Sequence, residues 1–139
     1  MKLRLKGAKG IKAGPSLDWT GPDEIEIDFT GKAGLIAMAG ENGGGKTTVL
    51  ESLSVYPQFV SRGGALWQGF MGREAEKEFE CDFMGSHYRS LIKMDCDQGK
   101  QEGYLWVNGK PVCNGKISSY KDVVNGIFGQ PFVYFRSQF

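Results

Sequence analysis

The sequence predicts an α/β fold with an attached antiparallel β-sheet, and three observations lead to this prediction. An apolar run at 34–39 leads directly into a glycine-rich loop at 40–45, and a segment of helical periodicity follows from Lys46. After residue 76 apolar and charged residues alternate strictly, which is typical of half-buried strands. An Asn-Gly pair at 108–109, placed between two apolar runs, indicates a tight hairpin in this second region.

The size and charge of the chain exclude several classes of protein. It has 139 residues, with 17 Lys and Arg against 16 Asp and Glu, and a formal net charge of +1. The length favours one domain or part of one, and the near-neutral balance disfavours a dedicated nucleic-acid module. The N-terminus lacks the apolar run of a signal peptide, and no stretch is as long as a membrane helix. We therefore expect a cytoplasmic protein that does not contact a membrane.

The first half of the chain predicts three strands. Leu3 and Leu5 alternate with charged residues, which is the pattern of a strand with one buried face. A second strand fits Glu24–Phe29, whose three apolar side chains share one face. The run Gly34–Ala39 is continuously apolar, so we expect a strand buried on both faces, as in the middle of an α/β sheet.

A helix and an antiparallel sheet are expected next. The helix should cover Lys46–Val55 and end before Pro57, because the residue before a proline avoids the helical region. Its apolar residues on one face are Val49, Leu50 and Leu53. Residues 58–75 form a loop-rich stretch without a clear pattern. The alternation over 76–113 then predicts an antiparallel sheet of four strands.

The last part of the chain predicts a short helix and a final strand. The helix should cover Tyr120–Phe128, with Ser118 or Ser119 as its N-cap. Its expected buried face consists of Val123, Val124, Ile127 and Phe128. The run 132–135 is strongly apolar, and the chain stops at Phe139 without a polar tail. We expect a chain that is cut inside a longer protein.

The segment Gly40–Thr47 matches the phosphate-loop pattern G-x-x-x-x-G-K-[ST]. Glycines at 43–45 let successive backbone N–H groups converge on a phosphate. Lys46, the expected catalytic residue, would bridge the β- and γ-phosphates, the Thr47 hydroxyl would ligate Mg²⁺, and Thr48 would donate to the α-phosphate. The residues expected to bind the nucleotide are Gly40, Glu41, Asn42, Gly43, Gly44, Gly45, Lys46, Thr47 and Thr48.

Other candidates for metal binding or catalysis are weak. Hydrolysis also needs an acid at a strand end to hold Mg²⁺. Asp95 ends an apolar run, but this run belongs to the antiparallel region, so we expect an ordinary solvated carboxylate. The single histidine, His87, has no partner at metal-ligand spacing. The cysteines form no C-x-x-C pair and are expected to be reduced thiols: Cys81, Cys96 and Cys113.

With these residues in hand, the chain resembles the N-terminal half of an ATPase head of the SMC/SbcC type. The family has an "IDF" strand, matched within Glu24–Phe29, and a phosphate loop of the form G-x-N-G-x-G-K-[ST]-[ST] followed by an acidic residue on the helix. The run Gly34–Glu51 matches this form, and Asn42 and the Thr47-Thr48 pair sharpen the match. The segment 135–137 resembles the family's sequence just before its lid glutamine. The similarity covers nearly the whole chain, most loosely at 58–75.

The resemblance implies the N-terminal lobe of an ABC-ATPase head with a P-loop NTPase fold, cut before the long antiparallel coiled coil that divides such heads. It divides the chain into a phosphate-loop core (1–57), an antiparallel β region (76–113) and a helix and strand leading toward the lid (114–139). It implies ATP and Mg²⁺ as cofactors, and hydrolysis only after the lobe is completed by its own C-terminal half and closed in a head-to-head homodimer. That half would carry the signature motif, the Mg²⁺-holding acid and the catalytic Glu. Gln138 is a possible stand-in for the lid glutamine.

The family acts in DNA repair, recombination or chromosome maintenance, so DNA and a nuclease or kleisin-like subunit are the implied partners. Two alternatives remain open on the residues alone. A transporter-type ABC subunit shares the loop. A non-enzymatic DNA-binding or interaction module would use a basic patch of five residues: Lys2, Arg4, Lys6, Lys9 and Lys12. In the SMC-like interpretation, Lys9 or Lys12 would instead approach the nucleotide.

Overall fold

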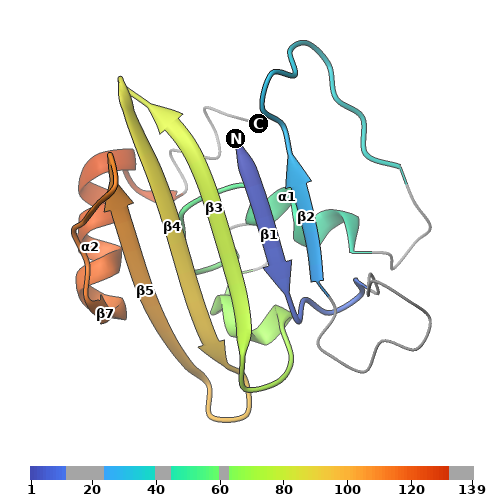
Figure 1. The fold of residues 1–139 in the computed structure, drawn as a ribbon. Coiled ribbons are helices and arrows are strands. Elements are labelled where there is room, and N and C mark those ends of the chain that lie inside the picture. The colour runs from blue at the N-terminus through green and yellow to red at the C-terminus, as the bar shows by residue number, and fades with distance from the viewer. Residues whose placement is uncertain (12–23, 40–44, 60–62, 132–139) are drawn as a thin grey trace.

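A computed structural model describes residues 1–11, 24–39, 45–59 and 63–131. These residues form a sheet of seven strands, all paired antiparallel, in the order β2-β1-β3-β4-β5-β6 with β7 beside β5. The strands are β1 (Lys2–Lys6), β2 (Glu24–Asp28), β3 (Ala75–Phe83), β4 (Ser86–Asp95), β5 (Lys100–Val107), β6 (Lys110–Pro111) and β7 (Gly115–Lys116). The helices are α1 (Lys46–Ser52), α2 (Ile117–Phe128) and a 3₁₀ helix (Leu66–Gly69). All three helices lie on one face of the sheet, α1 behind β1 and β2, and α2 behind β5 (Figure 1).

The predicted strands and hairpins of the antiparallel region are confirmed. Four strands, β3 to β6, occupy residues 75–111 and pair in sequence order. Both central residues of the β3–β4 turn have positive φ, 51° at Met84 and 82° at Gly85, as do Asn108 and Gly109 in the β5–β6 turn, at 50° and 81°. This geometry matches the right-handed twist of the flanking strands. β1 and β2 were also predicted as strands. In the structure they pair with each other, and β1 pairs with β3, so they belong to the same sheet as the antiparallel region.

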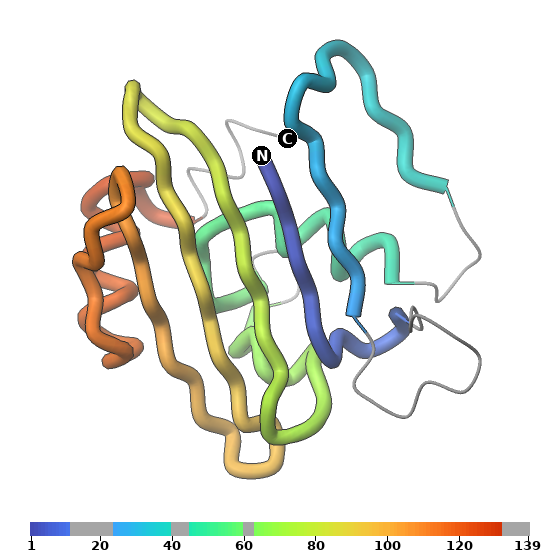
Figure 2. Tube along the Cα trace, viewed as in Figure 1, coloured from blue at the N-terminus to red at the C-terminus, as the bar shows by residue number. Residues whose placement is uncertain are grey.

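The apolar run 34–39 does not form the buried strand predicted for it. The structure assigns no strand there, Leu35 is 100% exposed and Ile36 is 50% exposed. Figure 2 shows this part of the chain leaving β2 and running away from the sheet. A strand needs a neighbour for its backbone groups and a layer to cover each face. Within the described residues no strand pairs with this run, and of its side chains only Met38 is partly buried against the core. The continuous apolar pattern of this run predicts burial, but it does not identify a strand that could pair with the run.

The helix after the glycine-rich loop is shorter than predicted. α1 ends at Ser52, and residues 53–57 continue as a non-helical segment in which Ser54, Val55 and Tyr56 are fully buried. Leu50, predicted to be buried, is exposed, whereas Val49 packs in the core. After the helix ends, the carbonyl groups of residues 55–57 bond to side chains of α2, β3 and β5.

α2 starts earlier than predicted and buries a different set of side chains. It begins at Ile117 after Lys116, so the serines at 118 and 119 lie inside the helix and do not cap it. Its buried residues are spaced by four: Tyr120, Val124 and Phe128. Of the predicted face, Val123 and Ile127 are only partly buried. Gly129 follows as the C-cap.

The uncovered face of the sheet carries charges that alternate from strand to strand. The neighbouring strands β2, β1, β3 and β4 each present side chains of mainly one charge sign on this face. The residues are Glu24, Glu26 and Asp28 on β2, Lys2, Arg4 and Lys6 on β1, Glu76, Glu78 and Glu80 on β3, and Arg89 and Lys93 on β4. Arg4 lies at the centre, with its guanidinium 2.8 Å from Glu76 and 3.2 Å from Glu78. Hydrogen bonds from Arg89 and Arg4 outweigh the effect of burial and lower the pKa of Glu78.

Substituting two glycines should give opposite changes in stability. A Cβ atom at Gly103 would lie 2.4 Å from Cγ of Tyr120, so Gly103→Ala must displace α2 from β5 and should destabilise the fold by about 1–3 kcal/mol. A Cβ atom at Gly126 of α2 would meet no other atom within 4 Å, so Gly126→Ala should stabilise by about 0.5–1 kcal/mol. Urea denaturation of both variants measures the difference. Equal effects would contradict the close packing of α2 on β5.

Candidate functional site

The described part of the phosphate-loop motif begins at Gly45, which is the N-cap of α1. Gly45 has φ of 79°, in the left-handed region that glycine adopts without strain. A Cβ atom at this position would lie 2.6 Å from Cγ1 of Ile11. Both the backbone conformation and the contact with Ile11 therefore require glycine here. Residues 40–44, which include Glu41 and Asn42, lie outside the described residues.

The next three motif residues form the first turn of α1. Lys46 is half-buried, Thr47 is exposed at the same turn, and Thr48 is buried. No acidic residue lies in this turn. Lys46 and Thr47 thus place an ammonium group and an accessible hydroxyl on adjacent residues where the helix begins. This donor set fits a Mg²⁺-bound nucleoside triphosphate, for which the ammonium would offset phosphate charge and the hydroxyl would be a metal ligand.

The segment behind α1 is held by side chains from three other elements. The Tyr120 hydroxyl of α2 donates to the Val55 carbonyl, Nζ of Lys77 on β3 donates to the Tyr56 carbonyl at 2.9 Å, and Nε2 of Gln101 on β5 donates to the Pro57 carbonyl at 3.2 Å. Three successive carbonyl groups are therefore bonded by side chains. We refer to residues 54–57 as the post-helix segment.

Lys77 is the most unusual residue of this arrangement. It is completely buried, and burial lowers the pKa of its ammonium to about 7. Its second neighbour is the Ser54 hydroxyl, with Nζ and Oγ 3.4 Å apart. Lys77 belongs to no sequence motif, although the alternating pattern of its strand indicates that it faces inward. Lys77 occupies an inward position of the alternating strand, between Ala75 and Phe79.

Tyr120 was also missed, although its hydroxyl is central to the polar part of the core. It donates to Val55 and accepts a hydrogen bond from the Ser90 hydroxyl of β4. Burial raises the pKa of Tyr120, so the hydroxyl stays protonated and remains a donor at neutral pH. Because the three groups lie 30 to 65 residues apart, no local pattern connects them.

Three of the basic residues near the N-terminus, Lys2, Arg4 and Lys9, have protein partners. Lys9, predicted to approach a nucleotide, donates from Nζ to the Gln68 carbonyl at 2.9 Å, so the structure directs it to the 3₁₀ helix. Lys2 lies 3.6 Å from Asp28, and Arg4 pairs with acidic residues of the two neighbouring strands. Their charges are largely neutralised, which disfavours a basic surface for nucleic acid. Lys12 lies outside the described residues.

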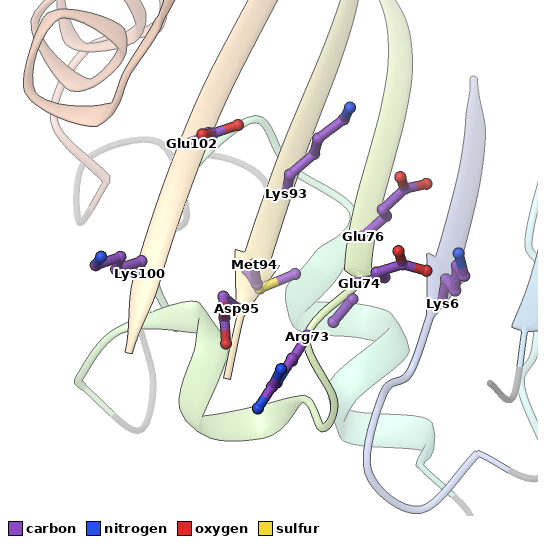
Figure 3. Close-up of a pocket in the computed structure, with 10 residues that line it drawn as sticks. Lys6, Arg73, Glu74, Glu76, Lys93, Met94, Asp95, Lys100 and Glu102 are labelled. Atoms are coloured by element: carbon purple, nitrogen blue, oxygen red, sulfur yellow. The ribbon is translucent and has the colours of Figure 1, made fainter. Parts of the chain in front are cut away.

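Asp95 lies at a turn and in a mixed-charge pocket. Its Oδ1 accepts the backbone N–H groups of Asp97 at 3.1 Å and Gln98 at 3.2 Å, so it caps the β4–β5 turn. The pocket has a volume of about 470 Å³ at the end of the sheet (Figure 3). Its charged lining residues are Lys6, Arg73, Glu74, Glu76, Lys93, Asp95, Lys100 and Glu102. Four acidic and four basic groups give it no dominant charge.

The cysteines agree with the sequence prediction. All three lie within the described residues and are free thiols. Burial is the main cause that raises the pKa of each, to about 11 for Cys81. Across the described ranges, no three His, Cys, Asp or Glu side chains gather as they would around a metal ion. Nor does any helix in those ranges have the length and apolar character needed to span a bilayer.

Comparison of the chain with protein-family models and with curated proteins found no match.

Lys77 should make the free energy of unfolding rise with pH. A lysine in the unfolded chain has a pKa near 10.4, whereas Lys77 in the folded chain has a pKa of about 7. Between these values the unfolded chain binds more protons, so stability increases with pH and is lost as the pH falls toward 7. We expect the difference between wild type and Lys77→Met to change by about 1 kcal/mol per pH unit between pH 7 and 10.

Urea denaturation at several pH values measures this difference, and the titration of the tyrosines and cysteines cancels between the two proteins. Lys93→Met is the matched control, because Lys93 lies on the uncovered face of the sheet. Its stability difference from wild type should not vary with pH. A pH-independent difference for Lys77→Met would mean that the buried amine titrates like a solvated one.

Proposed function

We propose that residues 40–48 bind ATP with Mg²⁺, and that the chain is the nucleotide-binding N-terminal half of an ATPase head of the SMC/SbcC type. The observation that carries the proposal is the motif itself, with its last glycine in the left-handed conformation directly before α1 and Lys46 and Thr47 on the first turn. The conformation of Gly45 and its contact with Ile11 supply a reason for glycine that is independent of the pattern.

Each described residue of the loop has a role in this proposal. Lys46 would offset the charge of the β- and γ-phosphates, and is the residue whose charge matters most as the γ-phosphate departs. Thr47 would ligate Mg²⁺ through its accessible hydroxyl. Thr48 would serve the α-phosphate, although its burial leaves it less accessible than Thr47. ATP supplies the reactive phosphoanhydride, and these side chains bind and orient it.

The exposed apolar run at 34–39 supports the second part of the proposal. Leu35 and Ile36 expose apolar surface just before the loop in the sequence, and burying such surface against another segment is favourable. In the proposed head, the C-terminal half of the same protein would pair with this run, and a second head would close the site. On this proposal DNA is the partner of the whole protein, and the 139-residue chain alone binds ATP–Mg²⁺ weakly and hydrolyses it hardly at all.

ATP–Mg²⁺ should stabilise the wild-type chain and leave Lys46→Ala unchanged. A ligand that binds only the folded state raises its stability, by about 2.7 kcal/mol at a hundredfold excess over Kd. Removal of the ammonium leaves the phosphate charge unbalanced, so binding is lost while the fold remains. Thermal melts with and without ATP–Mg²⁺ measure the shift. Thr47→Ala should keep most of the shift seen with ATP alone and lose the part that depends on Mg²⁺.

The control for this experiment is Lys93→Ala, which removes the same charge from the uncovered face of the sheet and should keep the full shift. An equal shift for wild type and Lys46→Ala would show that Lys46 does not contact the nucleotide. The phosphate-loop proposal would then be abandoned.

A further inference from the structure

The post-helix segment fixes the end of α1 that lies away from the proposed nucleotide. Its three carbonyl groups are bonded by Tyr120, Lys77 and Gln101, which come from α2, β3 and β5. The segment itself passes behind the sheet, directly after α1 (Figure 2). Its position is therefore set by side chains that are anchored in the sheet and in α2.

α1 connects this segment to the loop as a short rigid rod. Seven helical residues span about 10 Å, so Lys46 lies only one short helix away from Ser54. The buried residues of α1 include Thr48, Val49 and Ser52. A shift of the post-helix segment would therefore shift α1, and with it the ammonium and hydroxyl groups on its first turn.

We infer that Lys77 and Tyr120 are positioning residues for the nucleotide site, which act through the post-helix segment and α1 and couple the antiparallel sheet to the phosphate loop. This inference rests on the proposed function, because it concerns how the proposed site is held. Neither residue is a catalytic residue, since each bonds to the backbone of the post-helix segment and not to the loop.

The chemistry of the two donors explains why they specify a position. A buried carbonyl group that loses its hydrogen bond is costly, so each carbonyl can occupy only the place where its donor reaches it. An apolar core residue at position 77 would avoid the cost of burying an amine, which also appears as the lowered pKa of Lys77. An apolar residue would, however, let the segment slide, since apolar contacts are not directional. Lys77 and Tyr120 therefore hold the post-helix segment at one position along the sheet.

The test measures the Kd for ATP–Mg²⁺ of Tyr120→Phe and Lys77→Met, in variants whose circular dichroism spectra show that they remain folded. Each change removes donors to the post-helix segment and touches no loop residue, and we expect Kd to rise about fivefold or more. The matched control is Tyr104→Phe, which removes a hydroxyl bonded to Glu102 on the uncovered face. Its Kd should equal that of wild type.

A second measurement uses the wild-type chain and needs no variant to fold. In protein labelled with ¹³C-tyrosine, ATP–Mg²⁺ should move the NMR signal of Tyr120 and leave that of Tyr104 in place, because coupling between two sites is reciprocal. A merely structural role for Tyr120 would leave its signal unmoved.

The outcomes separate the inference from the proposed function. Weaker binding by the two variants together with a moved Tyr120 signal supports the coupling. Unchanged binding by folded Tyr120→Phe and Lys77→Met overturns the coupling and leaves nucleotide binding intact, and so does an unmoved Tyr120 signal at saturating ATP–Mg²⁺. If the variants do not fold, the NMR result decides. If wild type binds no ATP–Mg²⁺, both the proposed function and the inference are overturned.

Discussion

The hydrogen bond from the buried amino group of Lys77 to the Tyr56 carbonyl joins the two parts of this molecule. One part is the sheet, and the other is the short helix with the glycine-rich loop before it. The chain leaves α1 after seven residues and runs through the core with its carbonyl groups facing side chains of the sheet and α2. Without these donors, buried carbonyl groups would lack partners. The position of the segment after α1 relative to the sheet therefore depends on them.

The elements that were predicted correctly depend on signals local to the chain. The alternation of Leu3 and Leu5 with charged residues and the Asn108-Gly109 turn specify a strand and a hairpin over a few residues. The end of α1 could not be predicted in this way, because the donors that capture its following segment lie 21, 44 and 65 residues away. The strand predicted at 34–39 failed for a related reason, since no strand among the described residues pairs with this run.

The candidate site shows the same division between local and distant information. A pattern of spacing was sufficient to select Gly45, Lys46 and Thr47, and the structure places them together at the start of α1. The resemblance, and not a spacing pattern, suggests Lys9 near the nucleotide, and in the structure its ammonium bonds to the Gln68 carbonyl, 59 residues later. Lys77 and Tyr120 belong to no motif. An inward-facing lysine in an alternating strand could have been found from its register, but its acceptor could not.

The alternation of charge across the uncovered face has a consequence for how the strands find their neighbours. A shift of β1 by two residues along β3 would still place basic residues opposite acidic ones, so these charges do not select the register. They do select the order. If β2 paired directly with β3, two rows of carboxylates would face each other, and like charges directly opposite are unfavourable. β1 lies between these rows. Repulsion between the acidic strands β2 and β3 therefore disfavours their direct pairing, and each pairs with the basic strand β1 instead. During folding, this electrostatic selectivity would weaken as salt screens it.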